Sequence, residues 1–159
     1  MALDGPRIER ARTFVAEAGA SRKARYFALD WLKAHQLTES YDDRMSLVTS
    51  ELAANAVLHT SRPFTVALDS RDGCVRIEVV DSAPDRGALP VPTTGSAVDL
   101  TEVSETGRGL QIVSSLVQRW GVTRDANLKT IWCELEPEPP SESATPVLVD
   151  HRPPQEQRA

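Results

Sequence analysis

The residues best suited to chemistry in this sequence fall in three short segments that lie far apart in the chain. Glu51 and Asn55 are four residues apart in a helix-like run, so their side chains share one helix face. Asp81 ends an apolar strand-like run, and Gly107-Arg108-Gly109-Leu110 is a glycine-flanked turn that opens another helix-like run. Together these groups are the parts needed to hold a magnesium nucleotide.

The pair on the helix offers two different kinds of oxygen. Asn55 supplies a neutral oxygen that suits a magnesium ion whose other ligands come mostly from phosphates and water. Glu51, one turn earlier, is placed to orient or deprotonate an attacking hydroxyl or water near that ion. The competing interpretation is ordinary polarity on a helix surface. Burial would make an unpaired carboxylate costly, so apolar neighbours favour a site; these neighbours are Leu52, Ala53, Ala54, Ala56 and Val57.

The other two segments are ambiguous when each is taken alone. An ionised Asp81 accepts hydrogen bonds and can read an exocyclic amino group such as that of adenine, whereas the alternative is a turn-capping aspartate before Ser82-Ala-Pro84. Gly107-Arg108-Gly109 offers free N–H groups and the positive end of a helix dipole to phosphate, with Arg108 as a charged donor. The alternative there is a tight turn that needs glycine for a positive φ.

A framework of helices and strands must bring these segments together. Apolar spacing predicts a helix through residues 24–32 and a second helix over 42–59, with Met45, Val48, Leu52 and Ala56 as the buried row of the second. A third helix begins near Gly109 and is expected to end at Gly121. Alternation and turn residues predict strands over 11–15, 64–69 and 74–81, near 122, and over 129–135. This order predicts an α+β two-layer sandwich, with a mixed, mostly antiparallel sheet and helices on one face.

Composition sets the limits of the domain and its surroundings. Residues 1–10 are expected to be flexible, residues 11–136 to form the domain, and residues 137–159, with six prolines, to form a disordered tail. The long segment 82–106 is expected to be a functional or disordered loop. The 159 residues carry a net charge of −5, which gives no basic field to attract nucleic acid or acidic lipid.

Cysteine usage and hydropathy indicate the compartment in which the protein is expected. Cys74 and Cys133 lie far apart in strand-like runs, as expected of buried thiols in a reducing compartment, and they form no zinc-binding set. No apolar run reaches the ~20 residues that span a membrane, and the N-terminus lacks a signal peptide pattern. The sequence therefore predicts a cytoplasmic protein with no membrane segment.

Taken as a set, the motifs resemble the histidine-kinase-like ATPase superfamily, known as the Bergerat fold. The likeness is strongest to its small single-domain branch, the bacterial anti-sigma-factor serine/threonine kinases, and it covers roughly residues 11–136. The first motif of the family is matched by Glu51-Leu-Ala-Ala-Asn-Ala-Val-Leu-His59, the second by Val-Val-Asp81 and the third by Thr-Gly-Arg-Gly-Leu-Gln-Ile-Val113.

This resemblance implies a role for each residue and a set of partners. Asn55 would hold Mg²⁺, Asp81 would bind the adenine amino group of ATP, and Gly107, Arg108, Gly109 and Leu110 would contact phosphate, with Glu51 as the general base. Members of this branch phosphorylate a serine on an anti-anti-sigma protein and also bind a sigma factor. A homodimer formed through the N-terminal strand and helix is usual in the branch.

Two departures from the family pattern leave an alternative open. Asp81 is followed by Ser82-Ala-Pro84 where many relatives have Asp-x-Gly-x-Gly, and Leu128-Lys129 stands where relatives often have Gly-Thr. Strand alternation puts Lys129 on the inward face with Ile131 and Cys133. The alternative is therefore a partner-binding module that sequesters a sigma factor and uses nucleotide only structurally, or not at all. A third interpretation, an α+β domain without a nucleotide site, requires every motif to be coincidental.

Overall fold

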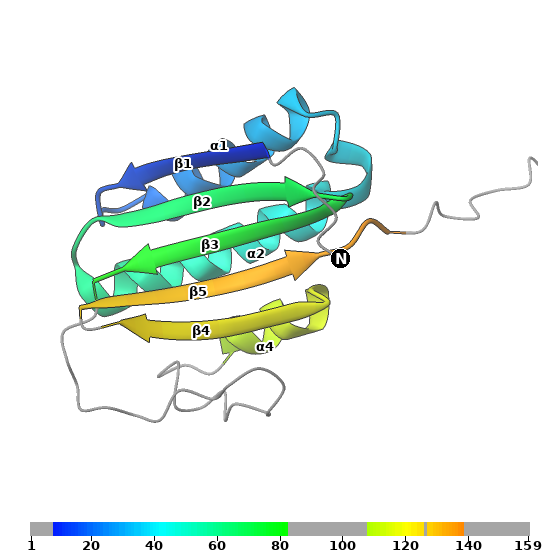
Figure 1. The fold of residues 1–159 in the computed structure, drawn as a ribbon. Helices are drawn as coiled ribbons and strands as arrows, with labels where there is room; N and C mark the ends of the chain where they lie inside the picture. Colours follow the sequence, from blue (N-terminus) through cyan, green and yellow to red (C-terminus); the bar gives the residue numbers. More distant parts are fainter. Residues whose placement is uncertain (1–7, 83–107, 126, 139–159) are drawn as a thin grey trace, which may run out of the picture.

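A computed structural model describes residues 8–82, 108–125 and 127–138, and these residues form a single sheet with helices packed on it (Figure 1). The segments 1–7, 83–107 and 139–159 lie outside the described residues, so most of the expected loop and tail falls there. In chain order the elements are β1 (Ile8–Phe14), α1 (Ala20–Ala34), α2 (Thr38–Thr60), β2 (Phe64–Arg71), β3 (Cys74–Asp81), α4 (Arg108–Leu116), β4 (Arg119–Asp125) and β5 (Leu128–Leu135).

The strands form one five-stranded sheet in the order β1-β2-β3-β5-β4, and every neighbouring pair is antiparallel. The expected α+β class is confirmed, but the expectation of a mixed sheet is wrong for the described strands. The reason is visible at β1 and β2, where Phe14 pairs with Phe64. The helical pair α1–α2 returns the chain to the end of the sheet from which it left, and the next strand runs back along the first.

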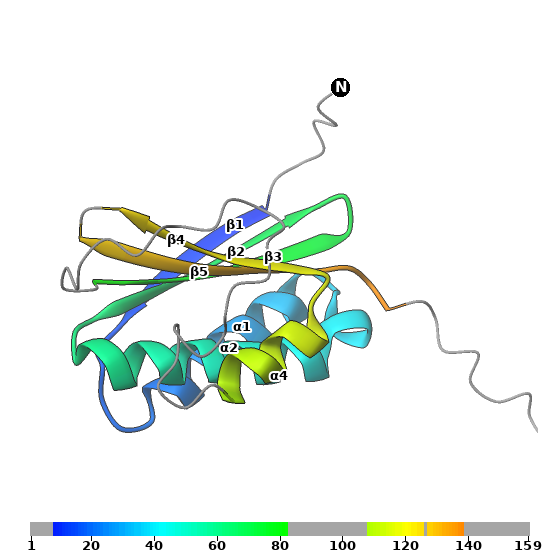
Figure 2. The same ribbon diagram turned by 90° about the horizontal axis from the view of Figure 1, so that it is seen from below.

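The three helices lie on one face of the sheet, so the domain has two layers (Figure 2). The predicted row on α2 is confirmed, because Met45, Val48, Leu52 and Ala56 are all buried. Inward residues of the central strands meet this row from the sheet side. The residues of this shared core include Trp31, Leu32, Phe64, Val66, Leu68, Val75, Ile77, Val79, Ile131, Cys133 and Leu135.

The ends of several elements differ from the predicted ones. β1 begins at Ile8, so residues 8–10 belong to the sheet and not to a flexible N-terminus. α2 begins at Thr38, four residues before the expected start. α4 ends at Leu116, and both Trp120 and Gly121 lie in β4.

Gly121 has a packing role that local sequence does not reveal. It lies directly opposite Trp132, and a Cβ at position 121 would come within 2.7 Å of the Trp132 ring. The glycine therefore leaves room for an indole that lies across the neighbouring strand. It does not terminate a helix.

The β2–β3 hairpin is tighter than the predicted four-residue turn. Only Asp72 and Gly73 lie between the strands, with φ values of 51° and 78°. Two consecutive residues with positive φ are typical of the tight turns that match the twist of a two-residue hairpin. This turn fixes the register that carries Asp81 to the far end of β3.

The remaining expectations concern cysteines and membrane segments. Both cysteines are free thiols; Cys133 is buried, and Cys74 is only half-buried. Among the described residues, no helix has the length and apolar character needed to cross a membrane.

Candidate functional site

Glu51, Asn55 and His59 lie one turn apart along α2, beside its buried row. Glu51 and Asn55 are half-buried and His59 is exposed, so the row runs along the border between core and surface. The Asn55 Oδ1 atom is buried and has no hydrogen-bond partner among the described residues. An unpaired buried acceptor costs about 1–3 kcal/mol, so this oxygen is available to a ligand that supplies a donor or a cation.

Gly109 brings the start of α4 against Glu51. A Cβ at position 109 would lie 2.8 Å from Glu51 Oε2, a separation that real side chains do not reach without a shift. Glycine therefore permits this approach. The structure brings the predicted glycine turn next to Glu51, the predicted general base. Because Gly109 lies in the first turn of α4, the Glu51 carboxylate also lies near the positive end of that helix dipole.

Asp81 and Lys129 form a buried ion pair at the end of the sheet. They are direct cross-strand neighbours on β3 and β5, and Lys129 Nζ lies 3.2 Å from Asp81 Oδ2. Asp81 is 2% exposed and Lys129 is 4% exposed. The second carboxylate oxygen, Asp81 Oδ1, is buried without a hydrogen-bond partner among the described residues. One oxygen of this carboxylate is thus engaged by the protein and the other remains an open acceptor.

Burial raises the pKa of Asp81 above its ordinary value, because a buried site disfavours the charged form. Lys129 opposes this effect through its charge and its hydrogen bond, and the charges of His59 and Arg124 oppose it to a smaller extent. The ammonium of Lys129 is therefore the main group that favours the ionised form of Asp81 in its buried position.

These contacts give the site a direction along α2. Gly109 contacts the Glu51 end of the polar row, and Asp81 pairs with Phe64, which follows the His59 end of α2 by four residues. The row spans eight residues, or about 12 Å of helix. Asn55 lies midway along this row, between Glu51 and His59.

The predicted site residues are thus brought together only in part. Arg108 is the first residue of α4, Gly109 follows in the first turn, and Gly107 lies outside the described residues. Leu110 is 2% exposed and belongs to the core, so its side chain is not a ligand and only its backbone can face one. Lys129 was expected to face inward with no assigned role, and the structure adds its ion pair with Asp81.

The residues present fit a bound Mg²⁺-nucleotide. The buried acceptors Asn55 Oδ1 and Asp81 Oδ1 lack partners among the described residues, and the space that a Cβ of Gly109 would fill is taken by the Glu51 carboxylate. A neutral amide oxygen suits Mg²⁺ that also takes phosphate and water ligands. Across the described residues, no group of three or more His, Cys, Asp or Glu side chains is placed to hold a metal.

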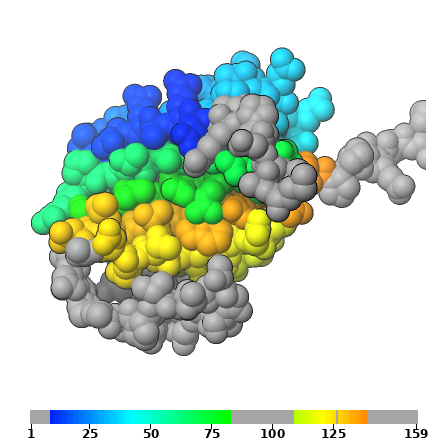
Figure 3. Space-filling model, in the orientation of Figure 1, coloured from blue at the N-terminus to red at the C-terminus, as the bar shows by residue number. Residues whose placement is uncertain are grey.

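A second region, on the open face of the sheet, has a different character. The side chains that point away from the helices cover this face from β1, in blue, to β4, in yellow (Figure 3). A cavity of about 430 Å³ lies near the β2–β3 turn, and Arg71, Asp72 and Cys74 line part of it.

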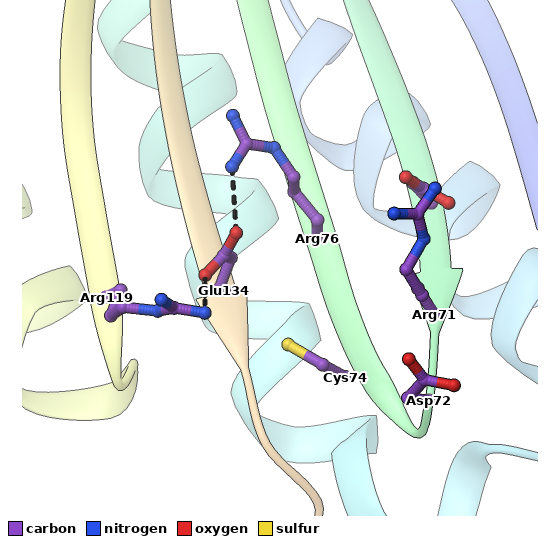
Figure 4. Close-up of a pocket in the computed structure, with 7 residues that line it drawn as sticks. Arg71, Asp72, Cys74, Arg76, Arg119 and Glu134 are labelled. Atoms are coloured by element: carbon purple, nitrogen blue, oxygen red, sulfur yellow. Dashed lines mark hydrogen bonds and ion pairs between the residues drawn. The ribbon is translucent and has the colours of Figure 1, made fainter. Parts of the chain in front are cut away.

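Inside this cavity the charged groups engage one another (Figure 4). Arg76 Nη1 donates to Glu134 Oε1 at 2.9 Å, and Arg119 Nη2 lies 2.7 Å from Glu134 Oε2. Arg76 also lies over the Trp132 ring, with its Cζ atom 4.4 Å from the ring centroid. These are cross-strand pairs that stabilise the sheet. The candidate nucleotide site therefore remains the one formed by α2, α4 and Asp81.

Comparison with known families identifies the class of protein. A family model for the histidine kinase-like ATPase domain matches residues 14–134, and the chain belongs to this family. Membership of an ATPase domain family implies ATP as the ligand. The match covers α2, β3, α4 and β5, which carry the residues described above.

Solved structures agree at the level of the fold. The crystal structure of the RsbU and RsbW domains of Rv1364c from Mycobacterium tuberculosis matches with a TM-score of 0.59 and 22% sequence identity. The match covers 82% of this chain and 32% of that one, so this chain spans about a third of the length of its structural relative. No curated protein matches the chain.

Proposed function

We propose that this protein is an anti-sigma-factor serine/threonine kinase that uses Mg²⁺-ATP to phosphorylate a serine on an anti-anti-sigma protein. The observation that carries the proposal is a pair of buried oxygens without hydrogen-bond partners in the described part of the chain, Asn55 Oδ1 and Asp81 Oδ1, in a member of an ATPase family. The motifs around these atoms resemble those of the anti-sigma-factor kinases. The fold-level likeness to a structure that contains an RsbW domain agrees with the same branch.

Each residue then has a defined task in phosphoryl transfer. Asn55 would hold Mg²⁺, which supplies neutralisation of phosphate charge when bound. Asp81 Oδ1 would accept a hydrogen bond from the base, and the backbone of Gly107, Arg108, Gly109 and Leu110 would face the phosphates. Glu51 would accept the proton of the partner's serine hydroxyl, and its contact with Gly109 supports this role by holding the carboxylate beside the phosphate-binding turn.

Calorimetry tests the nucleotide site first. The purified protein is titrated with ATP with and without Mg²⁺, and the titration is repeated with Asn55→Ala. Saturable one-site binding that requires Mg²⁺ and is weakened in the variant supports the proposal. Absence of binding to the wild type would remove the kinase proposal for this chain.

Phosphoryl transfer then tests the base. Candidate anti-anti-sigma proteins are incubated with the chain and labelled ATP, and wild type is compared with Glu51→Ala and Glu51→Gln. Loss of transfer with retained ATP binding supports Glu51 as the base. Unchanged transfer in both variants would refute that assignment.

A non-catalytic alternative is favoured by the Asp81–Lys129 ion pair. Where relatives often have a threonine, this chain places an ammonium 3.2 Å from the carboxylate that would read the base. A module that sequesters a sigma factor could keep nucleotide as a structural ligand only. Steady ATP consumption that depends on both Glu51 and a partner counts decisively against this alternative.

The proposal extends to assembly and location. A homodimer through β1 and α1, contact with a sigma factor, and a cytoplasmic location follow from the branch that the chain resembles. We also propose that the ATP-binding domain runs from Ile8, where β1 begins, to about residue 136. Sedimentation of the full chain at several concentrations tests the dimer.

A further inference from the structure

We propose that Lys129 is a specificity-determining residue and that the Asp81–Lys129 pair accepts guanine nucleotides as well as adenine nucleotides. The inference rests on the proposed nucleotide site and adds the identity of the bases that it takes. It depends on the position of an ammonium beside a carboxylate whose second oxygen is open.

A carboxylate that faces position 6 of the purine ring discriminates strongly between the two purines. An ionised carboxylate is an acceptor only, so it pairs with the amino group of adenine and is repelled by the carbonyl oxygen that guanine carries at the same ring position. A buried site that is made for one hydrogen-bonding group rejects a ligand without it by on the order of 10⁴-fold. A subsite that sets Asp81 alone against ring position 6 would therefore exclude guanine, and guanine turned so that N1–H faces Asp81 would leave O6 buried without a donor.

Lys129 changes this arrangement because it adds donors next to the acceptor. Its ammonium has three N–H groups, and the 3.2 Å contact with Asp81 Oδ2 uses one of them. Asp81 Oδ1 has no hydrogen-bond partner among the described residues. The subsite thus presents an open acceptor beside further donors, in a position where both side chains are almost fully buried.

Such a pair satisfies both purines, in opposite senses. The adenine amino group donates to Asp81 Oδ1 while Lys129 donates to N1. With guanine turned over relative to adenine, Lys129 donates to O6 while the N1–H group donates to Asp81 Oδ1. Neither base leaves Asp81 Oδ1 unpaired, and neither places two acceptors against each other.

Binding of four triphosphates to the full chain tests this inference. The probes are Mg²⁺ complexes of ATP, GTP, ITP and purine riboside 5′-triphosphate, measured by calorimetry. We expect GTP and ITP to bind within about tenfold of ATP. Purine riboside triphosphate lacks the donor for Asp81, and we expect it to bind at least about 100-fold more weakly than ATP.

Substitutions at Lys129 assign the effect to this residue. Lys129→Met removes the donors at similar volume and should raise the preference for ATP over GTP by at least about tenfold. Lys129→Arg keeps charge and donors and should keep GTP binding. Lys33→Met, at an exposed position on α1, is the matched control and should leave the preference unchanged.

The outcomes separate this inference from the proposed function. If ATP binds and GTP and ITP bind more than about 100-fold more weakly, the inference is overturned and the ATP site stands. If Lys129→Met weakens ATP and GTP equally, Lys129 has no part in selection. If none of the triphosphates binds wild type, the proposed function fails and the inference falls with it. The wild-type comparison does not depend on the folding of any variant.

Discussion

Replacing Lys129 by methionine gives the sharpest test of the buried ion pair, because it removes the charge and keeps the volume. The side chains of Lys129 and Asp81 are 6% and 2% exposed, and their charged atoms lie 3.2 Å apart. At an effective dielectric constant of about 20, two unit charges at this distance attract by about 5 kcal/mol. Breaking a buried pair by removing one partner typically costs about 3–5 kcal/mol.

Protonation of Asp81 sets an upper limit on this cost. In the unfolded chain the carboxyl titrates near its ordinary value of 3.8. Neutralising it at pH 7 costs about 4 kcal/mol, and at pH 5 about 2 kcal/mol. The folded variant can avoid a buried charge by protonating Asp81, at a cost of no more than these amounts. The free energy of unfolding that the variant loses relative to wild type should therefore become smaller as the pH falls.

The direction of this pH dependence follows from proton uptake. In Lys129→Met the folded state would hold a proton on Asp81 that the unfolded state releases above about pH 4. Stability of the variant relative to wild type is therefore greatest at low pH and is lost as the pH rises through the raised pKa of the folded protein.

Urea unfolding at pH 7 and pH 5 measures these differences, provided that the slope against urea is unchanged. We expect Lys129→Met to lose about 3–4 kcal/mol at pH 7 and no more than about 2 kcal/mol at pH 5. The double variant Asp81→Asn/Lys129→Met leaves no unpaired charge and should recover most of the loss. Lys33→Met is the matched control. A loss below about 1 kcal/mol at pH 7, or equal losses at both pH values, would refute the reasoning.

Three further predictions concern Asn55, Gly109 and Cys133. Asn55→Ala should stabilise the ligand-free protein by about 1–2 kcal/mol in urea unfolding, through helix propensity and loss of an unpaired acceptor, and should weaken Mg²⁺-dependent ATP binding. Gly109→Ala should lower phosphoryl transfer at least about tenfold, because its Cβ displaces the Glu51 carboxylate. Burial raises the pKa of Cys133 from its ordinary value of 9.0 to about 12. Between these pH values the unfolded thiol releases its proton and the folded thiol keeps it, so the free energy of unfolding of wild type should fall by about 1.4 kcal/mol per pH unit more than that of Cys133→Ala.

Each of these predictions has an internal control. Ser46→Ala on α2 changes helix propensity without removing an unpaired acceptor, so a stabilisation equal to that of Asn55→Ala would contradict the desolvation argument. For Gly109→Ala, the substitution should cause no further loss of phosphoryl transfer when Glu51 is already replaced by alanine. Additive losses of transfer in the double variant would show that Gly109→Ala does not act through Glu51. For Cys133→Ala, the cavity lowers the free energy of unfolding by the same amount at every pH and so does not change its slope against pH. Parallel plots of unfolding free energy against pH for wild type and variant would show that the thiol does not titrate as described.

The periodicity of apolar residues was enough to predict the buried row of α2, because burial there depends on spacing within one helix. Met45, Val48, Leu52 and Ala56 follow that spacing, and the same spacing places Glu51 and Asn55 beside them. The hairpin was equally local, since Asp72-Gly73 has the residues that a positive-φ turn needs. These features required no knowledge of any distant part of the chain.

The errors arose where packing between strands decides the structure. Val117 and Trp120 continue the helical spacing of α4, yet the helix ends at Leu116. Trp120 belongs to β4, where Gly121 accommodates the ring of Trp132 from the adjacent strand. Helical spacing over one turn cannot distinguish these two outcomes, because the deciding contact lies outside the segment.

The Asp81–Lys129 pair explains why a plausible site could be predicted while its chemistry could not. Alternation placed both residues on the inward face, but their contact depends on β3 pairing with β5 and on the register of that pairing. Without the pair, Asp81 is an acceptor that reads one kind of group. With the pair, it is an acceptor beside a donor whose charge favours the ionised carboxylate, while burial favours the protonated one. The strand order of the sheet therefore shapes the recognition properties of the site as directly as the motifs do.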